Sequence, residues 1–192
     1  MKPFSGLTLE CIFTPATQEQ FSAALAEIRA AGAVGFDSET KPVFARGVVN
    51  SGPDIVQFAT KTRAFIFQLA QAECRPVLEE ILLAEDILKI GFDLKSDRLL
   101  LHRKLGVEMK AVLDLGTAFR KRGYRNTMGV KSAVGIVLQR NFQKSKHITT
   151  SNWSLAHLSS RQLEYAANDA YAALMVWAAL GCPGPEKPSR RR

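Results

Sequence analysis

The chain has 192 residues, of which 46% are hydrophobic and 23% are charged, which excludes an intrinsically disordered protein and is typical of a globular one with a sizeable core. The most apolar window, Ala172–Leu180, is much shorter than the ~20 residues of a membrane span, so no membrane association is expected. The net charge of +8 favours a polyanionic partner such as nucleic acid, although the same charge also serves solubility.

In chain order, hydrophobic periodicity and turn residues predict an alternation of strands and helices. The expected elements are a strand at 7–13, a helix at 17–31, a strand at 34–40, a hairpin of strands at 55–59 and 64–67, a helix at 73–84, a strand at 87–91, a helix at 93–105, a short strand at 107–113, and helices at 114–121, 127–138 and 160–180. This order predicts an α/β fold, with a mixed sheet of about five to six strands and helices on both faces.

The domain organisation follows from composition. Residues 1–182 are predicted to form one domain, and the proline- and arginine-rich residues 183–192 a disordered basic tail. Cys11, Cys74 and Cys182 lie far apart without a C-x-x-C pair, which indicates free thiols in a reducing compartment. No long apolar run follows the N-terminal residues, so a secretory signal is not expected and a cytoplasmic location is predicted.

Two carboxylates separated by one residue lie in the strand expected at 34–40. Because side chains alternate along a strand, Val34 and Phe36 face one side of the sheet. Gly35, Asp37 and Glu39 share the other side. Two acids on one face repel each other, and a hard divalent cation between them would relieve this repulsion. Alternatively, the strand ends at Phe36 and a polar turn follows, and from this stretch alone the two interpretations are equally good.

Two later segments carry acids that could join this pair. Asp93 stands where the following helix needs an N-cap acceptor, which favours a cap over a ligand. Asp97 lies one turn inside that helix, where it either complements the helix dipole or faces the strand ends as a ligand. Tyr165 and Asp169 are four residues apart and therefore neighbours on one face of an alanine-rich helix.

Taken together, three of these segments resemble the exonuclease motifs of the tyrosine (DEDDy) branch of the DEDD superfamily: Phe36–Glu39, Gly91–Asp97 and Tyr165–Asp169. The segments Thr150–Ser154 and Leu163–Tyr171 are similar to the exonuclease domain of the Werner-syndrome helicase and its stand-alone bacterial relatives, and ribonuclease D is more distant. The resemblance spans nearly the whole chain and implies a ribonuclease H-like fold. Asp93 departs from the second motif, and Lys41-Pro42 from the residues that follow the first.

The resemblance also implies a mechanism with two divalent metal ions, Mg²⁺ or Mn²⁺, held by carboxylates. Asp37, Glu39 and Asp169 would hold the first ion. Asp37 would bridge to a second ion, which Asp97 binds directly or through water. Tyr165 would orient the attacking water or help to deprotonate it. Without metal the clustered acids repel one another, and the protein is expected to be less stable near the site.

Further residues are weaker candidates. Phe44 is a candidate for stacking on a terminal base. Lys144, Lys146 and His147 are candidates for phosphate contacts, although a solvated basic loop explains them equally well. Asp114 begins a helix and is expected to be its cap.

The predicted function is a metal-dependent 3′→5′ exonuclease that releases nucleoside 5′-monophosphates from DNA or RNA. An RNA 3′-end trimming enzyme of ribonuclease D type and a catalytically silent nucleic-acid-binding module are the alternatives. No obligate protein partner is evident, and no residue distinguishes deoxyribose from ribose.

Overall fold

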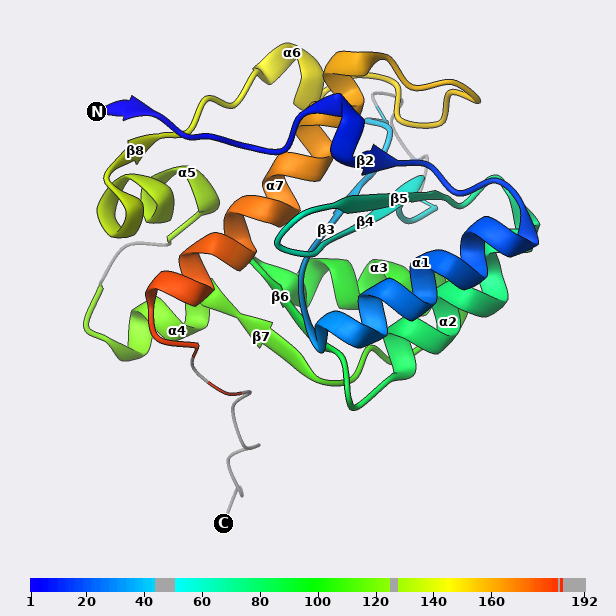
Figure 1. Ribbon diagram of the computed structural model, residues 1–192, viewed down its shortest axis with the longest axis horizontal. Coiled ribbons are helices and arrows are strands. Elements are labelled where there is room, and N and C mark those ends of the chain that lie inside the picture. Colours follow the sequence, from blue (N-terminus) through cyan, green and yellow to red (C-terminus); the bar gives the residue numbers. More distant parts are fainter. Residues whose placement is uncertain (44–50, 125–127, 183, 185–192) are drawn as a thin grey trace.

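The computed structural model describes residues 1–43, 51–124, 128–182 and 184. A six-stranded sheet runs through it in the order β2-β5-β4-β3-β6-β7 (Figure 1). β4 is antiparallel to both of its neighbours, and the other pairs are parallel. This confirms the predicted mixed sheet. The strands are β2 (Ile12–Phe13), β3 (Ala33–Glu39), β4 (Ile55–Ala59), β5 (Ala64–Gln68), β6 (Leu88–Gly91) and β7 (Val112–Asp114).

Helices cover both faces of the sheet, as predicted. One face carries α1 (Gln18–Ala31), α2 (Arg75–Leu83) and α3 (Leu94–Leu105), and α7 (Ser160–Ala179) crosses the other (Figure 1). No helix in the described ranges has both the length and the apolar character of a membrane span. The shorter elements are β1 (Lys2–Pro3), which pairs with β8 (Arg140–Asn141), 3₁₀ helices at Leu9–Cys11 and Ala72–Cys74, α4 (Leu115–Lys121), α5 (Val130–Ala133), a π-helix at Val134–Leu138 and α6 (Lys146–Thr149).

Three expected elements take a different form. The strand expected at 107–113 begins only at Val112, as β7, because Ala111 before it has a positive φ of 46°. The strand expected at 7–13 is a 3₁₀ turn followed by the two-residue strand β2, because the Leu7 backbone pairs with the Asn168 side chain and not with a neighbouring strand. The helix expected at 127–138 is the single turn α5 followed by the π-helix. Gly135 and β-branched residues make this segment a poor α-helix former, which accounts for the difference.

The predicted alternation along β3 is present. Val34 and Phe36 are fully buried in the core that α1, α2 and α3 form with the sheet. On the opposite face, alanines of α7 pack against Ile55 and Ile66 of the neighbouring strands. Gly35, Asp37 and Glu39 therefore face α7.

The backbone of α7 lies directly on Gly35. A Cβ atom built on Gly35 would be 1.9 Å from the carbonyl oxygen of Ala170 and 3.2 Å from Cβ of Leu174. Only glycine permits this approach, because any side chain at this position would meet backbone atoms. The contact brings Asp169, which precedes Ala170, to the part of β3 that carries Asp37.

We expect Gly35→Ala to lower the free energy of unfolding by about 2 kcal/mol or more, because α7 must shift to admit the methyl group. Gly129→Ala is the matched control. Gly129 has φ −98° and ψ 171°, and its built Cβ meets no atom of the described residues within 4 Å. Urea unfolding in EDTA measures both variants, and equal effects would contradict the importance of this contact.

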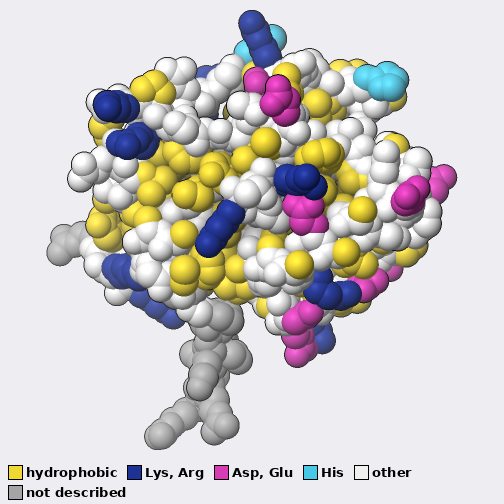
Figure 2. All heavy atoms as spheres, in the orientation of Figure 1, with side chains coloured by type: hydrophobic (Ala, Val, Ile, Leu, Met, Phe, Trp, Pro, Cys, Tyr) yellow, Lys and Arg dark blue, Asp and Glu magenta, His cyan; other side chains and the backbone are white. Residues whose placement is uncertain are grey.

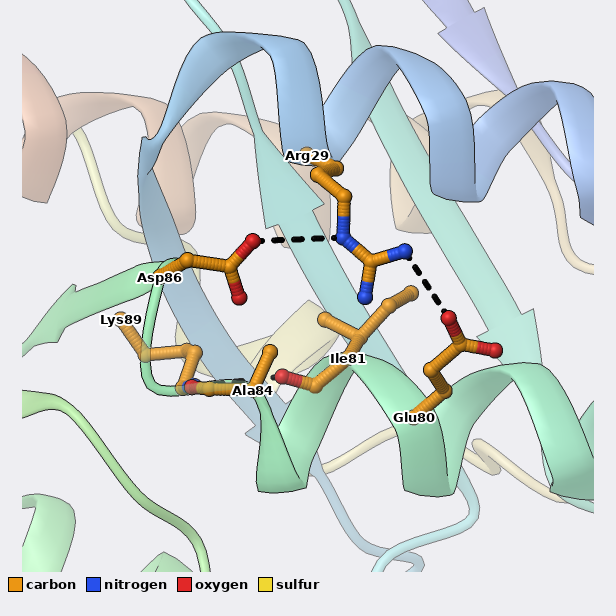
Figure 3. A network of polar contacts seen from close by, with 6 residues as sticks. All are labelled: Arg29, Glu80, Ile81, Ala84, Asp86 and Lys89. Carbon is orange, nitrogen blue, oxygen red and sulfur yellow. Dashed lines mark hydrogen bonds and ion pairs between the residues drawn. The ribbon is translucent and has the colours of Figure 1, made fainter.

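A buried lysine joins α2 to the sheet. Lys89 of β6 is fully buried, and its ammonium donates hydrogen bonds to the carbonyl oxygens of Ile81 (3.1 Å) and Ala84 (2.7 Å) at the end of α2 (Figure 3). These carbonyls have no partner inside the helix, and a cation at a helix C-terminus is favourable. Burial lowers the pKa of Lys89 to about 8, against the opposing charge of Asp86. Nearby, Arg29 of α1 pairs with Glu80 at the surface.

Lys89→Ala should destabilise the protein by about 2–4 kcal/mol, because it leaves a cavity and two buried carbonyl groups without their donor. Arg29→Ala, which removes two exposed ion pairs, with Glu80 and Asp86, should cost much less. Urea unfolding of the two variants at pH 7 provides the comparison. A similar loss in both would show that the buried ammonium has no special part in stability.

Candidate metal centre

Three carboxylates converge where β3 meets α7. Asp37 and Glu39 extend from β3 and Asp169 from α7, and one oxygen from each lies within 4.8 Å of the others. Glu39 is 9% exposed and Asp169 3% exposed, so the cluster is largely withdrawn from water. The sequence predicted that these three residues come together.

The carboxyl groups of the cluster have raised pKa values, because ionising all of them would bring several negative charges together in a buried place. Burial raises the pKa of Asp37 well above its ordinary value, and the charges of Asp169 and Glu39 raise it further. Burial, together with Asp169, raises the pKa of Glu39 to about 8. Burial also raises the pKa of Asp169, against the opposing charge of Lys144. Metal-free, the cluster therefore holds protons that a cation could replace.

Asp97 reaches the same end of β3 from the opposite side of the sheet. Its carboxylate accepts a short hydrogen bond from the hydroxyl of Ser38, whose side chain alternates with those of Asp37 and Glu39. Burial raises the pKa of Asp97 to about 6, although the bond from Ser38 opposes this. Asp97 lies outside the group of oxygens within 4.8 Å, but its charge contributes to the raised pKa of Asp37.

The expectation that Asp93 caps α3 is wrong. Asp93 occupies the N-cap position in a left-handed conformation (φ 56°, ψ 34°), and its side chain accepts no capping hydrogen bond within the described part of the chain. Asp114 takes over this role from β7, because its carboxylate accepts from the backbone N–H groups of Leu94 (2.8 Å) and Thr117 (3.0 Å). The prediction that Asp114 caps its own helix is confirmed, and it serves α3 as well.

Tyr165 lies on α7 one turn before Asp169, and both line the same cleft. Its hydroxyl is 2.7 Å from Oγ1 of Thr149. Either oxygen can be the donor in this pair, and Oγ1 of Thr149 also lies 3.1 Å from the carbonyl oxygen of Ser145, to which it can donate. Burial and then the charge of Asp169 raise the pKa of Tyr165 to about 12. Nothing in the sequence marked Thr149 as the partner of this hydroxyl.

Lys144 reaches the acidic cluster, a contact that the sequence did not indicate. Its ammonium lies 2.5 Å from Oδ2 of Asp169 and 5.6 Å from the centre of the Tyr165 ring. Lys146 and His147 are exposed on α6, and His147 lines the cleft. Phe44 falls outside the described residues. Lys144 thus contacts a carboxylate of the acidic cluster, and the phosphate contacts of Lys144, Lys146 and His147 stay predictions.

Gln57 was missed altogether. It stands directly opposite Asp37 in the β3–β4 register and is fully buried. Neither polar atom of its amide has a hydrogen-bond partner among the described residues. A buried amide without hydrogen-bond partners lowers the stability of the fold, so a polar residue at this position beside the acids calls for a functional explanation. The sequence could have indicated this residue, because Gln57 is the one polar residue in the otherwise apolar strand Ile55–Ala59.

A cleft of about 640 Å³ opens beside Tyr165 and Asp169. Its walls come from the N-terminal segment, the segment around α6 and the exposed side of α7. They combine aromatic with polar side chains, among them Phe4, Phe142, His147, Arg161 and Glu164. A space of this size accommodates a small organic ligand.

The model of the 3′-5′ exonuclease family matches residues 12–182. This chain belongs to the 3′-5′ exonuclease family. The bifunctional 3′-5′ exonuclease/ATP-dependent helicase WRN of Mus musculus is 30% identical over 150 residues, which cover 77% of this chain and 11% of that protein. A 3′-5′ exonuclease of Arabidopsis thaliana is 28% identical over 149 residues, which cover 77% of this chain and 52% of that protein. The chain thus spans only part of these relatives.

Solved structures share the fold. The EXO domain of Aedes aegypti Nibbler superposes with a TM-score of 0.77 at 22% identity, covering 90% of this chain and 88% of that one. RNase D of Escherichia coli gives a TM-score of 0.74 at 20% identity, covering 88% of this chain and 44% of that one. These likenesses confirm the predicted ribonuclease H-like fold.

Replacing Glu39 by Gln tests the electrostatics of the metal-free cluster. The folded protein holds the Glu39 proton up to about pH 8, whereas the unfolded chain releases it near 4.5. Wild-type stability should therefore fall as pH rises through this window, and Glu39→Gln is free of that loss. In EDTA, the stability of the variant relative to the wild type should grow by about 1–3 kcal/mol from pH 5 to pH 8.

Urea unfolding at the two pH values measures this difference. Glu10→Gln, which removes an exposed carboxylate outside the site, is the control. A difference between Glu39→Gln and the wild type that stays constant with pH would contradict the prediction.

Proposed function

We propose that this protein is a metal-dependent 3′→5′ exonuclease that hydrolyses phosphodiester bonds of DNA or RNA from the 3′ end and releases nucleoside 5′-monophosphates. The observation that carries this proposal is the convergence of Asp37, Glu39 and Asp169, whose oxygens lie within 4.8 Å of one another, in a chain of the 3′-5′ exonuclease family. Asp97 and Tyr165 complete the set that the tyrosine branch of the DEDD superfamily would require.

The residues present fit divalent metal ions. All the donors are carboxylate oxygens, which suit Mg²⁺ and Mn²⁺. Within the described ranges, Oδ1 of Asp169 accepts no well-formed hydrogen bond, whereas Oδ2 is 2.5 Å from the ammonium of Lys144, which an ion on that oxygen would have to replace. Asp37, Glu39 and Asp169 would hold one ion, and Asp37 with Asp97 a second. Such ions supply an activated water and stabilise the charge on the phosphoryl group and the leaving oxygen.

Tyr165 would act as a positioning hydrogen-bond partner of the attacking water. Its hydroxyl is 2.7 Å from Oγ1 of Thr149, and its place one turn before Asp169 brings it beside the acids. In the metal-free protein, a pKa of about 12 keeps the hydroxyl protonated at neutral pH. A protonated hydroxyl can orient the attacking water, which is one of the two roles that the family resemblance implies.

The terminal nucleotide would enter the cleft beside Tyr165 and Asp169. Phe4 and Phe142 offer apolar surface to a base, and His147 and Arg161 offer polar and charged contacts. On the face shown in Figure 2, Lys and Arg side chains are spread over the whole surface, and the acidic side chains lie in its right half. Part of the positive charge, including that of the final arginines, lies outside the described residues.

An RNA 3′-end trimming activity is the second candidate. RNase D of Trypanosoma brucei, solved in complex with RNA U12, superposes on this chain with a TM-score of 0.77 at 21% identity, covering 88% of this chain and 62% of that one. The third reading, a silent binding module, is less well supported because all four acids and the tyrosine are retained. All three cysteines, which lie in the described ranges, are unpaired, which supports a reducing compartment such as the cytoplasm.

A 5′-labelled oligonucleotide, incubated with Mg²⁺, Mn²⁺ or EDTA, tests the activity. The wild type should give a stepwise ladder of shortened products that EDTA abolishes, while a 3′-labelled strand should release labelled mononucleotide. Asp37→Asn should reduce the rate roughly a thousandfold or more, because it removes a proposed bridging ligand. Circular dichroism checks that the variant is folded.

Asp93→Asn is the matched control, since it makes the same chemical change at an acid outside the cluster. Asparagine also tolerates the left-handed backbone of this position. Its rate should stay within about threefold of the wild type. Binding of the oligonucleotide without any shortening would refute the enzyme, and an active Asp37→Asn protein would show that the site is misassigned. Matched DNA and RNA strands then separate the two substrate classes.

A further inference from the structure

The ammonium of Lys144 occupies the cluster of acids from the side of the cleft. It lies 2.5 Å from Oδ2 of Asp169, a carboxylate whose side chain is 2% exposed. The lysine side chain itself is 34% exposed, so it enters the site from the surface with only its end inserted. Burial alone would lower the pKa of Lys144, but the charge of Asp169 and the hydrogen bond to it, together with the charges of Tyr165 and Asp37, raise it.

A metal ion and this ammonium compete for the same atoms. Mg²⁺ binds carboxylate oxygens at about 2.0–2.1 Å, so an ion on Oδ2 of Asp169 would lie within a few ångströms of an ammonium at its present place. Two cations so close together repel strongly in a partly buried site. The carboxylate can therefore satisfy one of them at a time.

We propose that Lys144 stands in for a metal ion in the metal-free protein and that metal binding displaces it from Asp169. This inference rests on the metal site of the proposed function. In the metal-free state, Lys144 neutralises part of the charge that Asp37, Glu39 and Asp169 bring together. When metal binds, the ammonium leaves Asp169 and turns toward the cleft.

The surroundings of Lys144 allow this exchange without unfolding. Phe142 anchors the segment, since it is only 6% exposed, whereas residues 143–147 are exposed. The lysine stem has four rotatable bonds, so the ammonium can withdraw into solvent by rotamer changes alone. A surface lysine whose ammonium makes one buried contact can therefore leave the site and return to it reversibly.

Two measurable consequences follow. The energy of the Lys144–Asp169 pair must be given up when metal binds, so it weakens the apparent affinity for metal. The same pair stabilises the metal-free fold. Removal of the ammonium should therefore tighten metal binding and destabilise the metal-free protein, a combination that a purely structural or a purely phosphate-binding lysine would not produce.

The test uses the full chain without nucleic acid and compares Lys144→Met with Lys146→Met. Both substitutions remove one positive charge, and Lys146 is exposed on α6 two residues away. Titration with Mn²⁺, followed by the electron paramagnetic resonance of free Mn²⁺, gives the affinities. Lys144→Met should bind Mn²⁺ about five- to tenfold more tightly than the wild type, and Lys146→Met within about twofold of it.

Thermal melts in EDTA provide the second readout. Lys144→Met should melt at a lower temperature than Lys146→Met and gain more from added Mn²⁺. In an Asp169→Asn background, Lys144→Met should cause no further fall in melting temperature, because the pair is already broken. Lys144→Arg, which keeps a cation near the carboxylate, should hold Mn²⁺ affinity and stability close to the wild type.

A Lys144→Met protein that binds Mn²⁺ as the wild type does, or more weakly, would overturn the proposal while leaving the proposed function intact. Failure of the wild type and Lys146→Met to bind Mn²⁺ at all would overturn both, because the acids would then not form a metal site. The two failures are therefore distinguishable in one titration.

Discussion

The close approach of α7 to β3 at Gly35 is the contact on which the site depends. Two backbones can lie this near each other only where a side chain is missing, and the alanines of α7 extend the contact along the neighbouring strands. Because Asp37 follows Gly35 by two residues and Asp169 precedes Ala170 by one, the distance between these acids is set by regular structure and not by a loop. Sites built on helices and strands hold their geometry more accurately than sites on loops.

This rigid placement creates an electrostatic problem that the chain meets in several ways. Buried carboxylates held side by side must take up protons, pair with a cation or bind metal. The raised pKa values of Asp37 and Glu39 reflect the first way, and the contact of Lys144 with Asp169 the second. The buried amide of Gln57, which has no hydrogen-bond partner among the described residues, adds a further desolvation cost beside the acids. A site of this kind gives up stability, as functional sites commonly do.

Local periodicity was sufficient to predict much of this arrangement. Alternation along β3 placed Asp37 and Glu39 on one face, and the four-residue spacing placed Tyr165 beside Asp169. Local periodicity could not predict contacts between segments that are distant in the sequence. The sequence indicated that α3 needs an N-terminal cap. The cap is Asp114, which is twenty residues away from Leu94 and accepts a hydrogen bond from its backbone N–H. Lys144 belongs to a stretch without a period, so its partner was set by packing alone.

Asn168, the residue before Asp169, binds the backbone of the N-terminal segment. Asn168 accepts a hydrogen bond from the backbone N–H of Leu7 (2.7 Å) and donates to the carbonyl oxygen of the same residue (3.2 Å), and Pro3 and Phe4 form part of the cleft wall. The N-terminus thus lies along the rim of the site near β8 (Figure 1). A purification tag joined ahead of Met1 would therefore start beside this cleft.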